Sequence, residues 1–192
     1  ALTRAHQESR TCDLMLVLGT SAVVYPAASM PEIAKSAGAK VVEINPNDHK
    51  AWNNMGVILR RLGKIDESLK IYDKSVKIDS NYFLPYFNKG IALSILEKYP
   101  ESIEIFNQAI KLNPKYAGAY YNRGITYYAL QSYENAWDDY TKAIELNPGF
   151  ASSYAARGIL EMDVLKNDSL ALQDYNMAIK INPSFGMAYY NR

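Results

Sequence analysis

The sequence is poor in the features that mark several common classes of protein. It has one cysteine, Cys12, among 192 residues, so neither a disulfide framework nor a cysteine-based zinc cluster can form within it. No apolar run approaches the roughly 20 residues of a membrane-spanning helix, and the first residues lack the apolar core of a signal peptide. The net charge of +1 gives no electrostatic basis for binding nucleic acid or an anionic membrane. These absences favour a cytoplasmic protein.

The main feature that is present is a repeat of 34 residues. Four glycines lie 34 positions apart, each four residues after an aromatic residue; they are Gly56, Gly90, Gly124 and Gly158. Equivalent aromatic residues follow at Tyr72, Phe106, Tyr140 and Tyr175, and equivalent small residues at Ser75, Ala109, Ala143 and Ala178. Prolines close three of the units at positions 114, 148 and 183, and Ser80 stands at the same place in the first.

One complete unit, residues 117–150, shows what the repeat encodes. Bulky residues recur three or four positions apart, which predicts two amphipathic helices. The turn between them is expected at Ser132-Tyr133, and Asn147-Pro148 is expected to end the second helix because proline cannot continue it. Small residues at the recurring positions let the two helices cross closely.

This pattern resembles the tetratricopeptide repeat family, whose period and aromatic-Gly…Ala…aromatic…Ala…Pro signature it follows. The resemblance implies a mostly α fold, an α-solenoid occupying residues 47–192. Asn47 or Asp48 is expected to cap its first helix. The repeats are predicted at 49–82, 83–116, 117–150 and 151–185, with a truncated fifth at 186–192. The fourth is one residue longer, and we expect the loop at residues 165–169 to absorb the extra residue.

The first 46 residues follow a different pattern. An apolar run ending at Leu18 and a second one at residues 40–44 have the length of buried parallel strands, and residues 26–37 are expected to form a helix between them. Ligands of open parallel sheets bind beyond the carboxyl ends of the strands, where Gly19, Thr20, Ser21 and Asn45 stand. From the residues alone, Gly-Thr-Ser after a strand is also the sequence of an ordinary turn and helix cap.

Residues 1–46 resemble the C-terminal part of the catalytic domain of the sirtuins, the NAD-dependent protein deacylases. The resemblance implies a short β-α-β Rossmann-like segment in which Gly19, Thr20 and Ser21 contact NAD and Asn45 contacts the adenosine ribose. The glycine-rich GAG loop, the N-x-D segment, the catalytic histidine and the four zinc cysteines of that family are absent. His6 and His49 are interpreted as surface residues. We therefore expect no deacylase activity from this chain, and NAD as a cofactor only if a longer parent protein completes the domain. The sequence begins with Ala1 instead of methionine and ends within a fifth repeat, so we expect it to be a fragment of a longer protein.

The repeat resemblance further implies a concave groove lined by the first helix of each repeat. The residues expected to contact a bound peptide or helix are Asn53, Val57, Arg60, Phe87, Ile91, Tyr121, Ile125 and Tyr128. Phe87, Tyr121 and Tyr128 are the expected anchors, since aromatic side chains dominate such interfaces. Some members of the family clamp a peptide carboxylate with a lysine at the fifth position of a repeat. That position holds Asn53, Phe87, Tyr121 and Ala155, which argues against such a clamp.

Three functional interpretations stay open from the sequence. The first is a scaffold that recruits a protein or peptide and performs no catalysis. The second is an NAD-dependent deacylase with repeats appended for recruitment. The third is that residues 1–46 only cap the solenoid, or were joined to it by an assembly error. Recurring polar residues, among them Lys89, Arg123 and Arg157, are as readily explained by helix packing as by binding.

Overall fold

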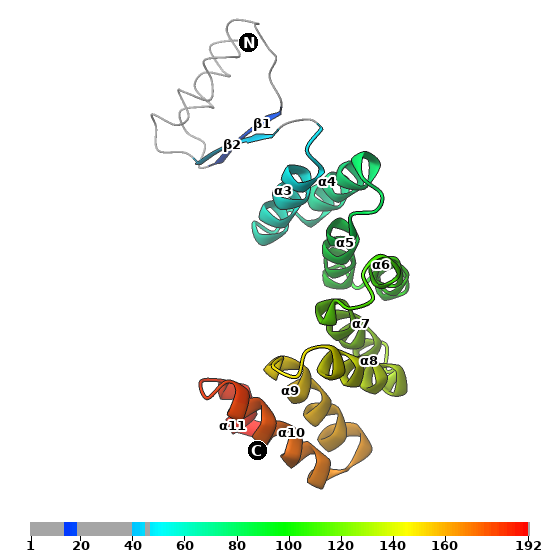
Figure 1. Ribbon diagram of the computed structural model, residues 1–192, viewed down its shortest axis with the longest axis vertical. Helices are drawn as coiled ribbons and strands as arrows, with labels where there is room; N and C mark the ends of the chain where they lie inside the picture. The colour runs from blue at the N-terminus through cyan, green and yellow to red at the C-terminus, as the bar shows by residue number, and fades with distance from the viewer. Residues whose placement is uncertain (1–13, 19–39, 45–46, 192) are drawn as a thin grey trace, which may run out of the picture.

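The computed structural model describes residues 14–18, 40–44 and 47–191, and most of these residues are helical. Four helix pairs follow one another along a bowed stack, with α3, α5, α7 and α9 on the inner side of the curve (Figure 1). The pairs are α3 (His49–Arg61) with α4 (Ile65–Ile78), α5 (Phe83–Ile95) with α6 (Tyr99–Leu112), α7 (Ala117–Ala129) with α8 (Tyr133–Leu146), and α9 (Ala151–Leu160) with α10 (Asp168–Ile181). A π-helical turn, η2 (Glu161–Leu165), extends α9, and α11 (Gly186–Asn191) packs against α10. None of the helices in the described ranges is long and apolar enough to cross a membrane.

Two short strands precede the helices. β1 (Leu14–Leu18) pairs in parallel with β2 (Lys40–Ile44), with Leu14 opposite Lys40 and Leu18 opposite Ile44. The helix predicted at residues 26–37 lies outside the described residues, so the complete β-α-β unit stays a prediction.

Within each repeat, an aromatic ring of the second helix packs directly on a glycine of the first. Tyr72, Phe106, Tyr140 and Tyr175 are at most 3% exposed. A Cβ atom placed on Gly124 would lie 2.7 Å from Cε1 of Tyr140, and one on Gly90 would lie 2.7 Å from Cε1 of Phe106. No side chain fits in that space, so the ring itself fills the crossing between the helices. The equivalence of these positions in the repeat therefore reflects one packing contact.

The ends of the second helices are fixed by asparagine or aspartate just before the proline position. The side-chain oxygen of this residue accepts a hydrogen bond from the backbone N–H two residues later, at 2.9 to 3.3 Å, in an Asx turn. The residues are Asp79, Asn113, Asn147 and Asn182. At the start of the array, Asp48 caps α3 by accepting from the N–H groups of Lys50 and Ala51, which confirms the predicted cap.

The turn between the helices of each repeat requires one residue with positive φ. These are Gly63 at 77°, Glu97 at 59°, Gln131 at 58° and Lys166 at 56°. In the fourth repeat, the prediction that the loop absorbs the extra residue is wrong. The additional residue lies in η2, where the Lys166 N–H bonds to the Glu161 carbonyl five residues earlier and the turn is correspondingly wider.

Basic residues of the first helices tie successive repeats together. Arg123 on α7 donates two hydrogen bonds to Asp139 on α8, at 2.8 and 2.6 Å, and a third to Asn107 on α6 at 2.5 Å. Arg157 repeats the arrangement with Asp174 and with Thr141 of the preceding repeat. Lys89 contacts Asp73 of the first repeat at 2.5 Å. These three basic residues therefore serve packing, as the alternative interpretation of the repeat predicts.

Replacing Gly124 with alanine tests the contact between glycine and ring. Alanine is favoured over glycine in a helix by about 1 kcal/mol, but forcing a methyl group against the Tyr140 ring costs about 1–3 kcal/mol. We expect a net loss of stability, measured as a lower midpoint in urea unfolding followed by circular dichroism. Gly149→Ala is the control, because its added Cβ meets only ordinary contacts. A Gly124→Ala variant as stable as the wild type would contradict this account.

Replacing Arg123 with methionine tests the ion pair. Asp139 is 4% exposed, and burial already raises the pKa of its carboxyl against the opposing effect of Arg123. Without the arginine the buried charge is unpaired, and we expect a loss of about 3 kcal/mol near neutral pH. In the variant, the pKa of the Asp139 carboxyl in the folded state lies further above its value in the unfolded state. The folded state therefore binds more protons than the unfolded state at pH values between the two. The deficit should therefore shrink as the pH falls through the raised pKa.

Urea unfolding of Arg123→Met at several pH values measures this effect. Lys142→Met, which removes an exposed pair with Glu145, should leave the midpoint unchanged. A deficit for Arg123→Met that does not depend on pH would argue against an unpaired Asp139 carboxylate as its cause.

Candidate functional site

Three of the predicted groove residues line one hollow on the inner side of the stack. Tyr121, Ile125 and Tyr128 of α7 face Ser152, Ala155 and Ile159 of α9. The hollow has a volume of about 240 Å³, and its lining is completed by Tyr140, Ala156 and Phe185. The first helices of repeats three and four thus supply opposite walls, and the buried Tyr140 ring reaches its floor. We call this feature the α7/α9 hollow.

The α7/α9 hollow is apolar apart from hydroxyl groups. Burial raises the pKa of Tyr121, against a hydrogen bond with Ser152 that lowers it. Burial, reinforced by the neighbouring Tyr121 and Tyr128, holds the pKa of Tyr140 far above its usual value. These phenols stay protonated at physiological pH, so the lining offers neutral hydroxyls and carries no charge of its own.

Two predicted anchors are covered by aromatic residues that sequence reasoning missed. The Tyr116 ring packs on Phe87 at a centroid distance of 5.0 Å, and the Phe150 ring packs on Tyr121 at 4.9 Å. Both covering residues are the last of their repeat, and Tyr82 holds the same place in the first. Tyr82, Tyr116 and Phe150 recur 34 residues apart, so the repeat pattern could have identified them as structural residues. Phe87 and Tyr121 therefore both contribute to packing, and Tyr121 also lines the α7/α9 hollow.

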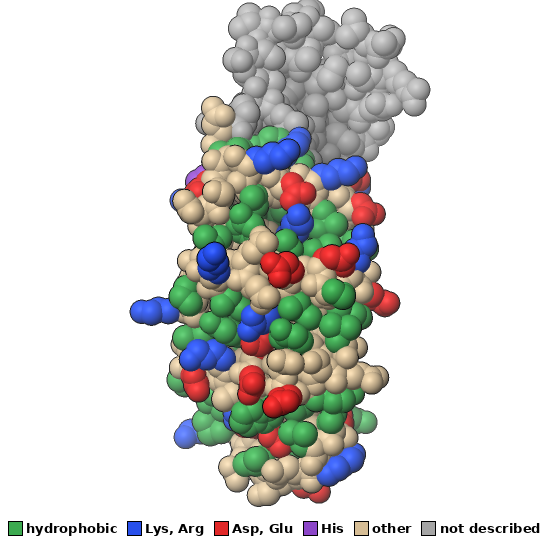
Figure 2. All heavy atoms as spheres, turned by 90° about the vertical axis from the view of Figure 1, so that its right-hand side faces the viewer, with side chains coloured by type: hydrophobic (Ala, Val, Ile, Leu, Met, Phe, Trp, Pro, Cys, Tyr) green, Lys and Arg blue, Asp and Glu red, His purple; other side chains and the backbone are tan. Residues whose placement is uncertain are grey.

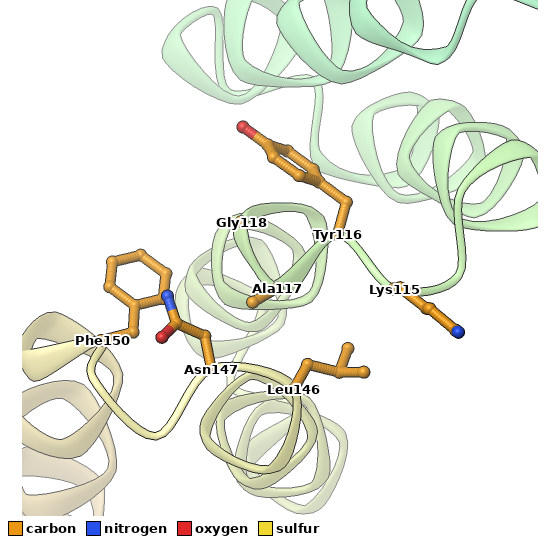
Figure 3. Close-up of a pocket in the computed structure, with 7 residues that line it drawn as sticks. All are labelled: Lys115, Tyr116, Ala117, Gly118, Leu146, Asn147 and Phe150. Carbon is orange, nitrogen blue, oxygen red and sulfur yellow. The ribbon is translucent and has the colours of Figure 1, made fainter.

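A second hollow, of about 440 Å³, lies where successive repeats join (Figure 3). In the close-up, Tyr116 and Lys115 come from the loop before α7, and Asn147 and Phe150 from the loop after α8. The Lys115 side chain extends away from the other labelled residues, and the Asn147 side-chain oxygen is engaged by the Gly149 N–H. This hollow is formed by connecting loops and brings no predicted site residue into contact with another.

The predicted groove residues of the first repeat are placed differently. Asn53 is 3% exposed, and its side-chain oxygen accepts a hydrogen bond of 2.9 Å from Asn88. Its side chain therefore joins the first two repeats instead of facing a ligand. Val57, Arg60 and, in the second repeat, Ile91 are partly exposed, but none of them lines the α7/α9 hollow.

The predicted NAD residues Gly19, Thr20, Ser21 and Asn45 lie outside the described residues. In the sequence they follow Leu18 and Ile44, the last residues of β1 and β2, which lie opposite each other in the parallel pair. Among the part of the chain that the structure describes, no group of three or more acidic, histidine or cysteine side chains is arranged to hold a metal ion. His49 is not a freely solvated histidine, because its ring packs edge-on against Tyr82 at 4.7 Å and lies 3.6 Å from Asp79.

Figure 2 shows one side of the array, on which basic and acidic side chains are interspersed with apolar ones. No continuous area of one sign covers the visible face of the helices. This distribution agrees with the small net charge and offers no broad basic surface on that side.

The fold is thus an α-solenoid built from helix pairs, a class of protein that presents extended surfaces to partners. Residues 49–82 and 117–150 match the model of the tetratricopeptide repeat, and residues 95–131 match a second model for TPR repeats. The helical part of the chain is an array of tetratricopeptide repeats, as the sequence predicts.

Solved structures share this fold. MamA superposes with a TM-score of 0.66 at 23% identity, over 74% of this chain and 82% of that one. The pilF protein of Pseudomonas aeruginosa gives a TM-score of 0.70 at 15% identity, over 74% of this chain and 65% of that one. The first TPR domain of Spaghetti (RPAP3), solved with the HSP90 peptide SRMEEVD, gives 0.60 at 25% identity, over 64% of this chain and 97% of that one.

Curated relatives match over a short stretch. The NAD-dependent protein deacylase of Mycobacterium leprae is 47% identical over 57 residues, and that of Aquifex aeolicus is 52% identical over 48 residues. These stretches cover 30% and 25% of this chain. The chain spans only about a quarter of the length of these relatives, 24% and 20%.

Proposed function

We propose that the array is a scaffold that binds a peptide or a helix of a partner protein on the inner side of its curve, without catalysis by the repeats. The observation that carries this proposal is the α7/α9 hollow. It is apolar, and it lies between the first helices of two successive repeats. Three of its lining residues, Tyr121, Ile125 and Tyr128, are predicted groove residues. Apolar hollows with few polar groups are the usual receptors for anchor side chains.

The related folds support the same proposal. The TPR domain of Spaghetti (RPAP3) was solved with a bound peptide, so a helix array of this kind accommodates a peptide ligand. The anchoring differs in our proposal, because the fifth position of the repeats lacks lysine and the α7/α9 hollow lacks charged side chains. The ligand is therefore held by apolar side chains and not by a terminal carboxylate.

Two isoleucines of equal exposure provide a matched test. Ile125 lines the α7/α9 hollow, and Ile78 lies at the end of α4 outside it; each is 39% exposed. A library of displayed random peptides is selected on the wild-type chain, and dissociation constants of synthetic copies are measured by fluorescence polarisation. We expect Ile125→Glu to weaken binding at least about 10-fold, because a carboxylate in an apolar hollow loses its hydration.

The control variant Ile78→Glu should bind the same peptides as the wild type does, and circular dichroism should show both variants folded. Equal affinity of all three proteins would rule out the inner groove as the binding surface. Failure to select any peptide would count against the scaffold proposal as a whole.

A second candidate is favoured by the deacylase matches. We propose that residues 1–46 belong to an NAD-dependent deacylase in a longer parent protein, whose repeats recruit substrates or partners. The identities near 50% over about 50 residues support this, as does the parallel pairing of β1 with β2, whose last residues lie opposite each other. Gly19, Thr20 and Ser21 would then contact NAD through backbone N–H and hydroxyl groups, and Asn45 would bind the ribose.

Nicotinamide release from NAD in the presence of an acetyl-lysine peptide tests this candidate. The 192-residue chain should release none, because the catalytic histidine and zinc cysteines of the resembled family are missing from it. The protein encoded by the full reading frame should be active, and Asn45→Ala should raise its KM for NAD about 10-fold through a lost hydrogen bond. An inactive full-length protein would eliminate the deacylase candidate and leave the scaffold proposal in place.

A further inference from the structure

One exposed acidic side chain, Asp163, lies about one helical turn beyond the α7/α9 hollow. Asp163 belongs to η2 and is four residues after Ile159, which lines the hollow. Its charge raises the pKa of Tyr128, in the wall of the hollow, after the larger effect of burial. Burial raises the pKa of Tyr175 to about 12, and the charge of Asp163 contributes to this shift as a smaller cause. Its position one helical turn beyond Ile159 therefore places Asp163 next to the α7/α9 hollow, and its effect on Tyr128 agrees with this placement.

Asp163 has no ion-pair partner among the described residues. Lys166 is three residues away, but the two side chains form no salt bridge. Two neighbouring acidic groups are engaged: Glu161 accepts a hydrogen bond from the Trp137 indole at 2.5 Å, and Asp174 is paired with Arg157. Asp163 is also exposed, so its charge is available to a ligand.

The groove positions of the first repeat carry positive charge, opposite to that of Asp163. Asp163 is the thirteenth residue of the fourth repeat, and the same position of the first repeat holds Arg61, next to Arg60. The second and third repeats have Ile95 and Ala129 there. The groove positions therefore run from basic in the first repeat, through uncharged, to acidic in the fourth. The extra residue of η2 lies in the same turn as Asp163, so it sets where this carboxylate is placed.

From this arrangement we infer the chemistry of the ligand: a peptide segment that places a bulky apolar side chain in the α7/α9 hollow and a lysine or arginine beside it, against Asp163. The inference rests on the proposed scaffold function and specifies its partner. Charge complementarity orients the segment, because acidic residues further along it face Arg60 and Arg61. The apolar side chain supplies affinity, and the charges select direction and neighbouring sequence.

The selected peptides test this inference directly. Sequences enriched on the wild-type chain should combine a bulky apolar residue with a nearby lysine or arginine. Replacing that basic residue with glutamate in a synthetic peptide should weaken binding about 5-fold, the scale of an exposed charge pair. The Asp163→Lys variant should reverse the preference, and the difference should diminish in high salt. Glu104→Lys, on the outer helix α6, is the control and should bind as the wild type does.

The other outcomes separate this inference from the scaffold proposal. If the enriched peptides are acidic or uncharged beside the apolar residue, and bind Asp163→Lys as well as wild type, the inferred ligand chemistry is wrong. Loss of those peptides on Ile125→Glu would still support the groove. If the enriched peptides bind Ile125→Glu unchanged, or none is enriched, both proposals fail.

Discussion

The contact between a glycine of the first helix and an aromatic ring of the second is the constraint on which the rest of the array depends. At Gly124 and Gly90 the backbone lies so close to the ring that even a methyl group would meet it at 2.7 Å. This contact fixes the crossing of the two helices, and its recurrence makes one repeat the template for the next. The same contact also shapes the inner surface, because the Tyr140 ring that packs on Gly124 lines the α7/α9 hollow.

The polar contacts between repeats explain why the basic residues recur without forming a basic surface. Arg123 and Arg157 are each divided between an aspartate of their own repeat and a polar side chain of the preceding one. Their charges are thereby neutralised inside the stack. The α7/α9 hollow between the third and fourth repeats is left apolar, and it is this surface on which the scaffold proposal rests.

Much of the fold was predictable because the same pattern of glycine, aromatic and small residues recurs in four repeats. Helix pairs and close crossings follow from residues at fixed spacing, and the Asp48 cap follows from the residue types just before the first helix. The candidate site was less predictable. Asn53 was expected in the groove, but it is buried against Asn88, since a polar side chain near a repeat junction finds its partner in the next repeat. The extra residue of the fourth repeat was expected in a loop, but a π-helical turn holds it.

The sequence by itself determined the period, the helix pairs and the close crossing of the helices at small residues, because these depend on contacts within one repeat and on local backbone preferences. Only the tertiary structure decided which groove residues are available to a ligand. Tyr116 and Phe150 cover Phe87 and Tyr121, and Ile125 and Ile159 face one another across two repeats. Such exposure is set by how successive repeats stack, and the relative rotation of neighbouring helix pairs is not written in the periodicity of any one of them.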